Sequence, residues 1–400
     1  MTMSYPALFL KKHEDKRLRQ GHVWVFSNEV DLQRSPLDGF LAGDLAVVHD
    51  HAGKALGVAY VNPNTLICAR LLSRKPNASI GESFFKARIG AALQLRDRLF
   101  DKPYYRLVFG ESDGLPGLVI DRFGAVLSVQ ITTAGMEQRK DLLVKVLREL
   151  LEPEAILLKN DTGQRQVENL SQVHEVVHGH LPEALVIEEN GNRFLIDIAE
   201  GQKTGWFYDH RQSRWQLAQW SKGLKVLDLF SYAGAWGIAA ATAGAVEVTC
   251  VDSSESALAL AAQSAELNRR QDVMQFVRSD VFEFLKQARE EQRHYDVVVL
   301  DPPALIKRKK NFKAGFEAYR RLNHMALQVL DNNGLLVSAS CSHHLSRDNL
   351  HEILRSSARH IDRHLVFLAT AGQGPDHPVH PAMPETDYLK TYFCSVSNRF

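Results

Sequence analysis

Short, nearly continuous apolar runs recur through the C-terminal half of the chain, and each ends next to a polar residue. The first, residues 224–229, contains Asp228 and is followed by a loop that includes Ser231, Ala233 and Gly234 and by an alanine-rich stretch, 235–243. Continuous apolar runs are typical of strands buried on both faces of a parallel sheet. Small residues allow the following helix to pack closely on that sheet. The pattern predicts a strand, loop and helix of the kind that binds nucleotides.

Four more runs follow the same pattern. Residues 246–252 end in Asp252, residues 274–277 precede Asp280, residues 295–300 precede Asp301, and residues 334–340 precede Cys341. Open α/β sheets bind ligands outside the carboxyl ends of their strands. We therefore expect these side chains at the mouth of one ligand crevice, in a class I, Rossmann-like α/β domain.

The glycine spacing restricts the class of ligand that this site could bind. Gly234 and Gly237 do not form the G-x-G-x-x-G pattern of a nicotinamide site, and Asp228 would repel a pyrophosphate. Asp252 lies where such folds place the acid that binds a ribose. A ligand with ribose, adenine and a charged amine but no phosphate is favoured, and S-adenosylmethionine fits. The alternative is an ordinary doubly wound sheet that binds nothing.

Residues 202–211 precede the helix before the first of these strands, and we expect them to lie over the crevice. Phe207 or Tyr208 would stack on adenine, while the alternative places Trp206 and Phe207 in the core. The predicted cofactor-binding residues are Phe207, Asp209, Arg211, Asp228, Phe230, Ser231, Gly234, Asp252, Asp280 and Asp301.

The N-terminal region alternates short β-type runs (22–26, 44–48 and 55–60) with glycine and asparagine turns, which predicts a small β-barrel. Basic residues and the aromatic residues Trp24, Phe26 and Tyr60 suit phosphate pairing and base stacking, as in RNA binding. A solvated basic turn with core aromatics is the alternative. A second basic run follows Asp301. The predicted RNA-binding residues are Lys11, Lys12, Arg17, Trp24, Lys307, Arg308, Lys309 and Lys310.

Between these regions the pattern predicts a helix over 80–100, strands within 105–131, a helix over 136–151 and a strand at 155–159, with a hairpin over 186–198. The resulting domain division is a barrel at 1–78, a central α+β domain at 79–188 and the α/β domain at 189–400.

Composition excludes several classes of protein. The 400 residues are 45% hydrophobic with a net charge of +1, which is typical of a globular chain, and no apolar run is long enough to span a membrane. We expect a cytoplasmic protein that meets nucleic acid through local basic patches. Cys68, Cys250, Cys341 and Cys394 are too far apart for a zinc or disulfide pattern, and no metal site is predicted.

Cys341 is distinctive because it follows a strand that is expected to lie beside the strand before Asp301-Pro302-Pro303. There a thiol would face the crevice, and basic neighbours or His343 would lower its pKa. It is a candidate nucleophile, although a cysteine after a strand is more often structural.

Motifs over essentially the whole chain resemble the RNA cytosine-C5 methyltransferases of the large-subunit rRNA methyltransferase I type. They are residues 21–27, 110–118, 203–209, 228–232 with Gly234, 301–303, 340–342, 376–378 and 388–390. The resemblance implies a PUA domain, a central domain and a class I methyltransferase domain, with S-adenosylmethionine as cofactor and large-subunit rRNA as partner.

The resemblance also implies a mechanism. Cys341 would add to C6 of a cytosine, so that C5 accepts the methyl group, and Asp301 would bind the ring at N3 or N4. One position departs from the wider pattern, because Ala304 stands where two-cysteine enzymes carry the cysteine that assists release. The proton acceptor is thus unassigned.

Two alternatives stay open at this stage. One is an amino-group or guanine methyltransferase with a structural Cys341, and the other is a noncatalytic RNA-binding assembly factor. The sequence leaves open the target cytosine, naked rRNA or a particle as substrate, and the oligomeric state, a homodimer included.

Overall fold

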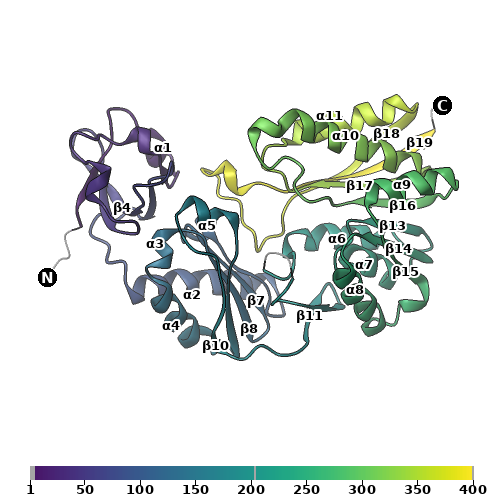
Figure 1. Ribbon diagram of the computed structural model, residues 1–400, viewed down its shortest axis with the longest axis horizontal. Coiled ribbons are helices and arrows are strands. Elements are labelled where there is room, and N and C mark those ends of the chain that lie inside the picture. The colour runs from purple at the N-terminus through teal and green to yellow at the C-terminus, as the bar shows by residue number, and fades with distance from the viewer. Residues whose placement is uncertain (1–4, 202–203, 399–400) are drawn as a thin grey trace. The chain divides into compact units, whose positions relative to one another are not determined.

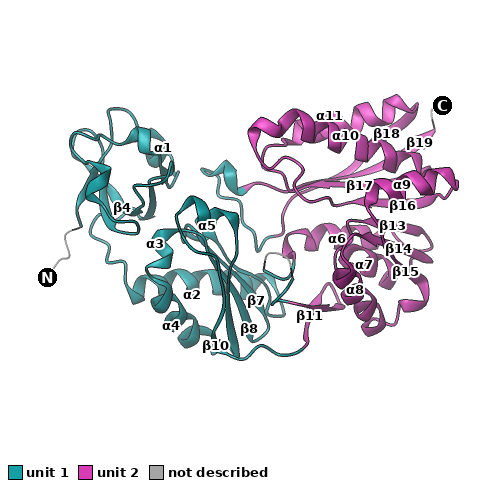
Figure 2. Cartoon of the chain, in the orientation of Figure 1, with its two compact units in different colours: residues 1–183, 198–206, 375–386 teal, residues 184–197, 207–374, 387–400 magenta. Residues whose placement is uncertain are grey.

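The computed structural model describes residues 5–201 and 204–398, and its chain divides into two compact units. Unit 1 comprises residues 1–183, 198–206 and 375–386; unit 2 comprises residues 184–197, 207–374 and 387–400 (Figure 2). Lys203, part of one of the motifs above, lies outside the described residues. The division at residues 78 and 188 into three domains stays a prediction.

The N-terminal part of unit 1 is drawn in purple in Figure 1, around the labels α1 and β4. It contains a five-stranded sheet in the order β1-β3-β4-β5-β2. Its strands are β1 (Ala7–Phe9), β2 (Trp24–Val25), β3 (Leu45–His49), β4 (Ala55–Val61) and β5 (Ala69–Ser73). Alternate residues such as Leu8, Val25 and Val48 are fully buried and form one core. The strands predicted from the periodicity are therefore present.

One aromatic assignment was wrong. We expected Tyr60 to supply aromatic surface, but it is fully buried. Its hydroxyl lies 3.0 Å from Pro116 O, to which it donates, and 3.1 Å from Thr133 Oγ1. Tyr60 thus joins the N-terminal sheet to the Gly114–Gly117 turn of the same unit.

The rest of unit 1 is built on a second sheet, in the order β10-β9-β8-β7-β6. The strands are β6 (Tyr104–Phe109), β7 (Leu118–Phe123), β8 (Val126–Ile131), β9 (Ala155–Asn160) and β10 (Val173–Gly179). The helices of this part are α2 (Glu82–Leu99), α3 (Ala134–Glu137), α4 (Lys140–Leu151) and α5 (Gly163–Val167), whereas α1 (Lys16–Arg19) belongs to the N-terminal part, whose core contains Leu18. Buried side chains of α2, α4 and the strands form a common core.

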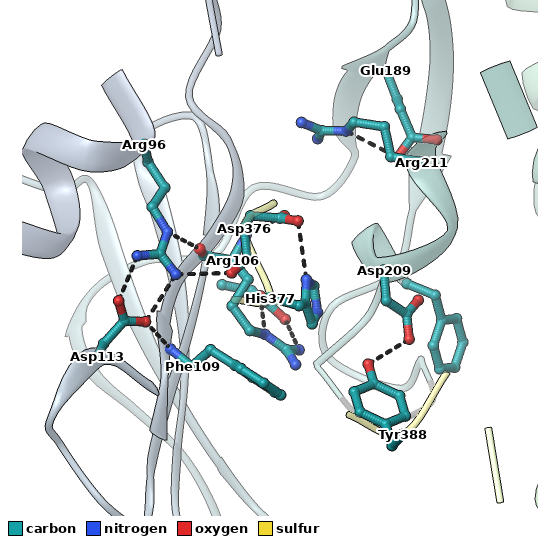
Figure 3. A network of polar contacts seen from close by, with 12 residues as sticks. Arg96, Arg106, Phe109, Asp113, Glu189, Asp209, Arg211, Asp376, His377 and Tyr388 are labelled. Atoms are coloured by element: carbon teal, nitrogen blue, oxygen red, sulfur yellow. Dashed lines mark hydrogen bonds and ion pairs between the residues drawn. The ribbon is translucent and has the colours of Figure 1, made fainter. Parts of the chain in front are cut away.

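A short segment close to the C-terminus, residues 375–386, also belongs to unit 1. The buried Arg96 donates to both carboxylate oxygens of Asp113 and to Asp376 O at 2.8 Å (Figure 3). The Arg106 N–H donates to Asp376 Oδ2, and the His377 ring lies 5.2 Å from that of Phe109. These contacts hold the segment against the second sheet of unit 1.

Unit 2 is a seven-stranded sheet in the order β15-β14-β13-β16-β17-β19-β18, whose first five strands are parallel and whose last two are antiparallel to their neighbours. The strands are β13 (Lys225–Leu229), β14 (Glu247–Asp252), β15 (Met274–Arg278), β16 (Tyr295–Leu300), β17 (Leu330–Ser340), β18 (Arg363–Ala371) and β19 (Lys390–Asn398), with a separate hairpin of β11 (Leu185–Glu189) and β12 (Asn192–Ile196). The helices are α6 (Arg211–Gln219), α7 (Ala235–Thr242), α8 (Glu255–Leu267), α9 (Val281–Glu290), α10 (Phe312–Gln328) and α11 (Arg347–His360).

This sheet confirms the predicted Rossmann-like α/β class. The strand order reverses between β13 and β16, so the carboxyl ends of these two strands flank the switch point at which such sheets bind ligands. In the described part of the chain, no helix is long and apolar enough to cross a membrane.

Candidate active site

The loop after β13 has a tight backbone. Phe230, Tyr232 and Gly234 have φ angles of 61°, 47° and 73°, in the left-handed region that side chains disfavour. A Cβ on Gly234 would lie 2.9 Å from the Cβ of Ala261 on α8. Glycine is therefore required where the loop meets α8, and the strained residues beside it form a turn over the end of β13.

Asp228 lies beneath this loop and is fully buried. Its Oδ2 accepts a hydrogen bond from the Gly237 N–H at 2.9 Å, while its Oδ1 has no partner among the described residues. Burial raises the pKa of Asp228 to about 8, and the carboxylates of Asp301 and Asp252 add to the effect. A cationic or hydrogen-donating ligand group would stabilise the charged form.

Asp252, the last residue of β14, anchors the other side of the loop. Its Oδ2 accepts from the Tyr232 N–H and its Oδ1 from the Ser254 N–H, both at 2.9 Å. The Ser231 N–H donates to Val251 O at 3.1 Å, and the buried Ser231 Oγ has no partner among the described residues. The predicted residues of β13, its loop and β14 are thus brought together.

The segment before α6 reaches the same loop through Phe207, whose ring lies 5.5 Å from that of Tyr232 in an edge-on arrangement. Asp209 is buried, and its Oδ2 accepts from the Tyr388 hydroxyl at 2.6 Å (Figure 3). Arg211 is buried, and its Nε lies 3.6 Å from Glu189 Oε2. Arg211 therefore pairs with the β11–β12 hairpin.

Asp280, another predicted cofactor residue, is exposed and caps the start of α9. Its Oδ1 accepts from the N–H groups of Phe282 and Glu283.

Asp301 follows β16 and is held by two residues that sequence analysis did not assign. Its Oδ1 lies 3.1 Å from His210 Nε2, and its Oδ2 accepts from Trp236 Nε1 at 3.1 Å. Burial opposes charge on both groups, but their mutual attraction outweighs it, raising the pKa of His210 and lowering that of Asp301. Asp301 is thus a fixed carboxylate that keeps 21% of its side chain exposed.

Cys341 lies directly beyond the end of β17, which pairs with β16 in parallel, as predicted. It is half-buried, whereas Cys68, Cys250 and Cys394 are buried. Its Sγ lies 4.0 Å from Pro302 O in the turn after Asp301. The hydroxyls of Ser340 and Ser342, on either side of Cys341, each lie 2.9 Å from the Tyr319 hydroxyl, so α10 fixes both neighbours of the thiol.

The predicted RNA-binding residues fall into two groups. Lys307, Arg308, Lys309 and Lys310 are exposed in unit 2, just before α10. In unit 1, Lys11 and Lys12 are exposed, while Arg17 pairs with Glu29 at 2.5 Å. Trp24 is half-buried and donates from Nε1 to Glu111 Oε1 at 2.9 Å.

Comparison with known proteins agrees with this geometry. Residues 8–74 match a PUA-like domain, and residues 163–385 match the S-adenosylmethionine-dependent methyltransferases. The chain is 37% identical over 395 residues to ribosomal RNA large subunit methyltransferase I of Cronobacter sakazakii, covering 97% of this chain and 99% of that one. It is 36% identical, with the same coverage, to the protein of that name from Escherichia coli O157:H7.

The chain belongs to the S-adenosylmethionine-dependent methyltransferases of the ribosomal RNA large subunit methyltransferase I family. Its fold is also that of a solved structure from Streptococcus mutans named as a SAM-dependent methyltransferase, with a TM-score of 0.83, 24% identity, and coverage of 98% of this chain and 100% of the other. A second structure, named as a methyltransferase complexed with SAH, has a TM-score of 0.84 at the same identity and coverage.

The cofactor of this methyltransferase is S-adenosylmethionine, and the donor set fits it. Asp228 Oδ1 and Ser231 Oγ are buried polar atoms that have no hydrogen-bond partner among the described residues. They lie at the tight loop after β13, where a ligand can come close to the backbone. Asp252 is an acid at a strand end, and Phe207 is an aromatic ring beside the loop. These residues would hold the amine, the ribose hydroxyls and the adenine.

The ion pair between His210 and Asp301 makes the stability of the methyltransferase depend on pH. Because the pKa of His210 is raised, its contribution is fully present below its unfolded value of 6.5 and is lost as pH rises through the folded value. The lowered pKa of Asp301 means that its contribution is present above 3.8 and is lost as pH falls through the folded value.

We expect His210→Gln, which keeps a neutral donor, to lower the free energy of unfolding by about 1 kcal/mol at pH 6, the difference between a charged and a neutral hydrogen bond. The difference from the wild type should shrink as pH rises. Urea unfolding over a range of pH values measures it, and a difference that grew with pH would contradict the assigned pair.

Proposed function

We propose that this methyltransferase transfers a methyl group to C5 of a cytosine in large-subunit rRNA, with Cys341 as the nucleophile. The observation that carries the proposal is the position of Cys341, a half-buried thiol with Sγ 4.0 Å from the carbonyl of Pro302, the residue after Asp301. Cys341 follows β17, the strand that pairs with β16, after which Asp301 stands. The names of the relatives support rRNA as the substrate.

The chemistry follows from the two side chains. The cofactor, when bound, supplies an electrophilic methyl group. The Cys341 thiolate forms a bond to C6 of the cytosine, and the electron pair of the C5–C6 double bond makes C5 nucleophilic toward that methyl group. After transfer a base removes the C5 proton, the double bond forms again, and the S–C6 bond breaks to release the thiolate.

Asp301 would act on the far side of the ring. Since its pKa is lowered, it is a carboxylate at neutral pH and accepts hydrogen bonds instead of donating them. It therefore suits the N4 amino group. It also suits N3 when that atom takes a proton from water as the thiolate adds at C6, and N3 returns this proton to water when the S–C6 bond breaks. The hydrogen bonds from His210 and Trp236 hold the carboxylate in one orientation.

Release of the product needs a different arrangement from that of two-cysteine enzymes. Ala304, which carries no titratable group, follows Pro303 where those enzymes have their second cysteine. We propose that a water molecule removes the C5 proton.

RNA would be held by the PUA-like part through Lys11, Lys12, Arg17 and Trp24, and by Lys307–Lys310 in unit 2. In this proposal the chain divides functionally at residues 78 and 188, with barrel, central and methyltransferase parts.

The test is the identity of the methylated nucleoside. The full chain is incubated with labelled S-adenosylmethionine and unmodified large-subunit rRNA, both naked and as a subunit particle, and the nucleosides are separated by mass spectrometry. We expect 5-methylcytidine. A methylated purine or N4-methylcytidine would favour an amino-group or guanine methyltransferase, and failure to bind the cofactor in calorimetry would favour a noncatalytic factor.

RNA that contains 5-fluorocytidine extends this test. Its C5 carries fluorine in place of the proton that the final step removes, so the S–C6 bond should persist after methyl transfer. We expect a covalent protein–RNA complex that resists denaturation and whose peptide link is Cys341. A complex linked through another residue would contradict the proposed nucleophile.

A further inference from the structure

A buried lysine lies against the loop that carries Cys341. Lys390 is the first residue of β19 and pairs in register with Ser340, the residue before Cys341. Only 5% of Lys390 is exposed, and its Nζ donates to Ser342 O at 2.7 Å, the carbonyl one residue beyond the thiol. The backbone of Lys390 therefore pairs with the residue before Cys341, and its ammonium group binds the carbonyl of the residue after Cys341.

The charge of this lysine lacks an ordinary counter-ion. Among the described residues, its Nζ forms no ion pair with a carboxylate, and its hydrogen bond to Ser342 O uses one of three protons. Burying an unpaired ammonium group is costly, and such a group usually pairs with an anion or loses its proton. Burial does lower the pKa of Lys390 to about 8, and the largest opposing effect comes from Cys341, ahead of Asp387.

None of the other charged and titratable groups described around Lys390 and Cys341 supplies a carboxylate that pairs with the Lys390 ammonium group. Arg347 of α11 is itself a cation, which lowers the pKa of Lys390 further, and it lies 3.6 Å from Asp387. Tyr319 of α10 has its pKa raised by burial and stays neutral. His343, which was expected with the basic neighbours to lower the pKa of Cys341, is exposed, and its ring lies 5.6 Å from that of Tyr388.

We propose that Lys390 is the counter-cation of the Cys341 thiolate and keeps this residue ionised and in place for attack on the pyrimidine ring. The thiol proton leaves to solvent, and Lys390 stays protonated because the new anion lies beside it. Lys390 is a positioning residue that acts through Cys341. The inference rests on the proposed function, because a thiolate is useful only to a nucleophile.

The experiment measures the thiol itself, without RNA or methyl transfer. The full-length protein is treated with iodoacetamide at pH 5 to 10, and alkylation of the Cys341 peptide is followed by mass spectrometry. An isolated thiol has a midpoint near pH 8.5, to within about a unit. We expect a midpoint at least a unit lower in the wild type, and a midpoint at or above the ordinary value would overturn the proposal even if no variant folds.

Two variants and a control complete the design. Lys390→Met should react about tenfold more slowly at pH 7 and recover the wild-type rate at pH 10, whereas Lys390→Arg should keep the low midpoint. Lys225→Met is the matched control, because Lys225 is exposed and is the first residue of β13. It therefore lies at the amino ends of the parallel strands, whereas Lys390 pairs with Ser340 at the carboxyl end of β17. In Lys390→Met the kcat for methyl transfer should fall at pH 7 and rise with pH while the KM for the cofactor is unchanged. Identical alkylation profiles in the wild type and Lys390→Met would overturn the ion pair.

The outcomes separate this inference from the proposed function. If the wild type makes 5-methylcytidine through Cys341 but its alkylation midpoint is ordinary, Lys390 only ties down the Ser342 carbonyl. If the midpoint is low but Cys341→Ala still methylates RNA, the ion pair exists and the proposed nucleophile is wrong.

Discussion

Cys341→Ala is expected to lower kcat for 5-methylcytidine formation by about a thousandfold or more, with cofactor affinity unchanged. Removal of a covalent nucleophile takes away the step that activates C5. Alanine keeps the backbone of the loop, whose neighbours Ser340 and Ser342 are held by Tyr319 and not by the thiol. Methyl transfer to rRNA and calorimetry with S-adenosylmethionine measure the two effects separately.

Cys394→Ala is the matched control for this variant. Cys394 is a buried thiol of β19, and it pairs with Leu336 of β17, the strand that Cys341 follows. Its replacement removes a thiol of the same sheet at some cost in stability but should keep kcat within a fewfold of the wild type below the unfolding temperature. Activity in Cys341→Ala close to that in Cys394→Ala would make both cysteines structural.

Asp301→Asn is expected to lower kcat by about a hundredfold to a thousandfold, within the range for a group that stabilises charge on a reacting ring. Asparagine can still accept from Trp236 Nε1, but it has no charge to pair with His210 or with a protonated N3. Single-turnover methyl transfer at saturating cofactor and RNA measures the chemical step. A change confined to KM would assign Asp301 to binding alone.

Asp296→Asn makes the corresponding control on the same strand. Asp296 lies near the start of β16, whereas Asp301 follows its carboxyl end, so the two carboxylates are at opposite ends of one strand. Asp296 Oδ2 accepts from the Lys225 N–H at 2.8 Å. Asparagine retains that acceptor, so kcat should stay close to the wild-type value. A similar loss in both variants would indicate a general defect of β16 and not a role for Asp301.

Local patterns were sufficient for most of the strands. The apolar runs that end at Asp252 and before Asp301 are β14 and β16 in the structure. They could be predicted because a strand that is buried on both faces consists almost entirely of apolar residues. The hairpin around Asn190-Gly191 was likewise confirmed, as β11 and β12. The predicted strand at 334–340 was correct but short, since β17 begins at Leu330.

Two predictions from local patterns were wrong because contacts between distant parts of the chain determine the structure there. The helix expected over 136–151 is divided into α3 and α4, and the two residues between them bind the N-terminal sheet region: Gln138 Nε2 donates to Ala42 O, and Arg139 donates to Gly43 O. Tyr60 was expected at the surface, but Pro116 and Thr133 supply hydrogen-bond acceptors that make its burial possible.

The sequence by itself determined the class of fold, the cofactor type and the placing of Asp228, Asp252, Asp301 and Cys341 at strand ends, because strand periodicity and parallel pairing put such residues at one edge of a sheet. Only the tertiary structure decided which side chains act on them. His210 and Trp236 meet at Asp301, and Lys390 meets the Cys341 loop, from elements far apart along the chain. No spacing rule predicts such contacts, since they depend on how helices and an antiparallel last strand pack on the sheet.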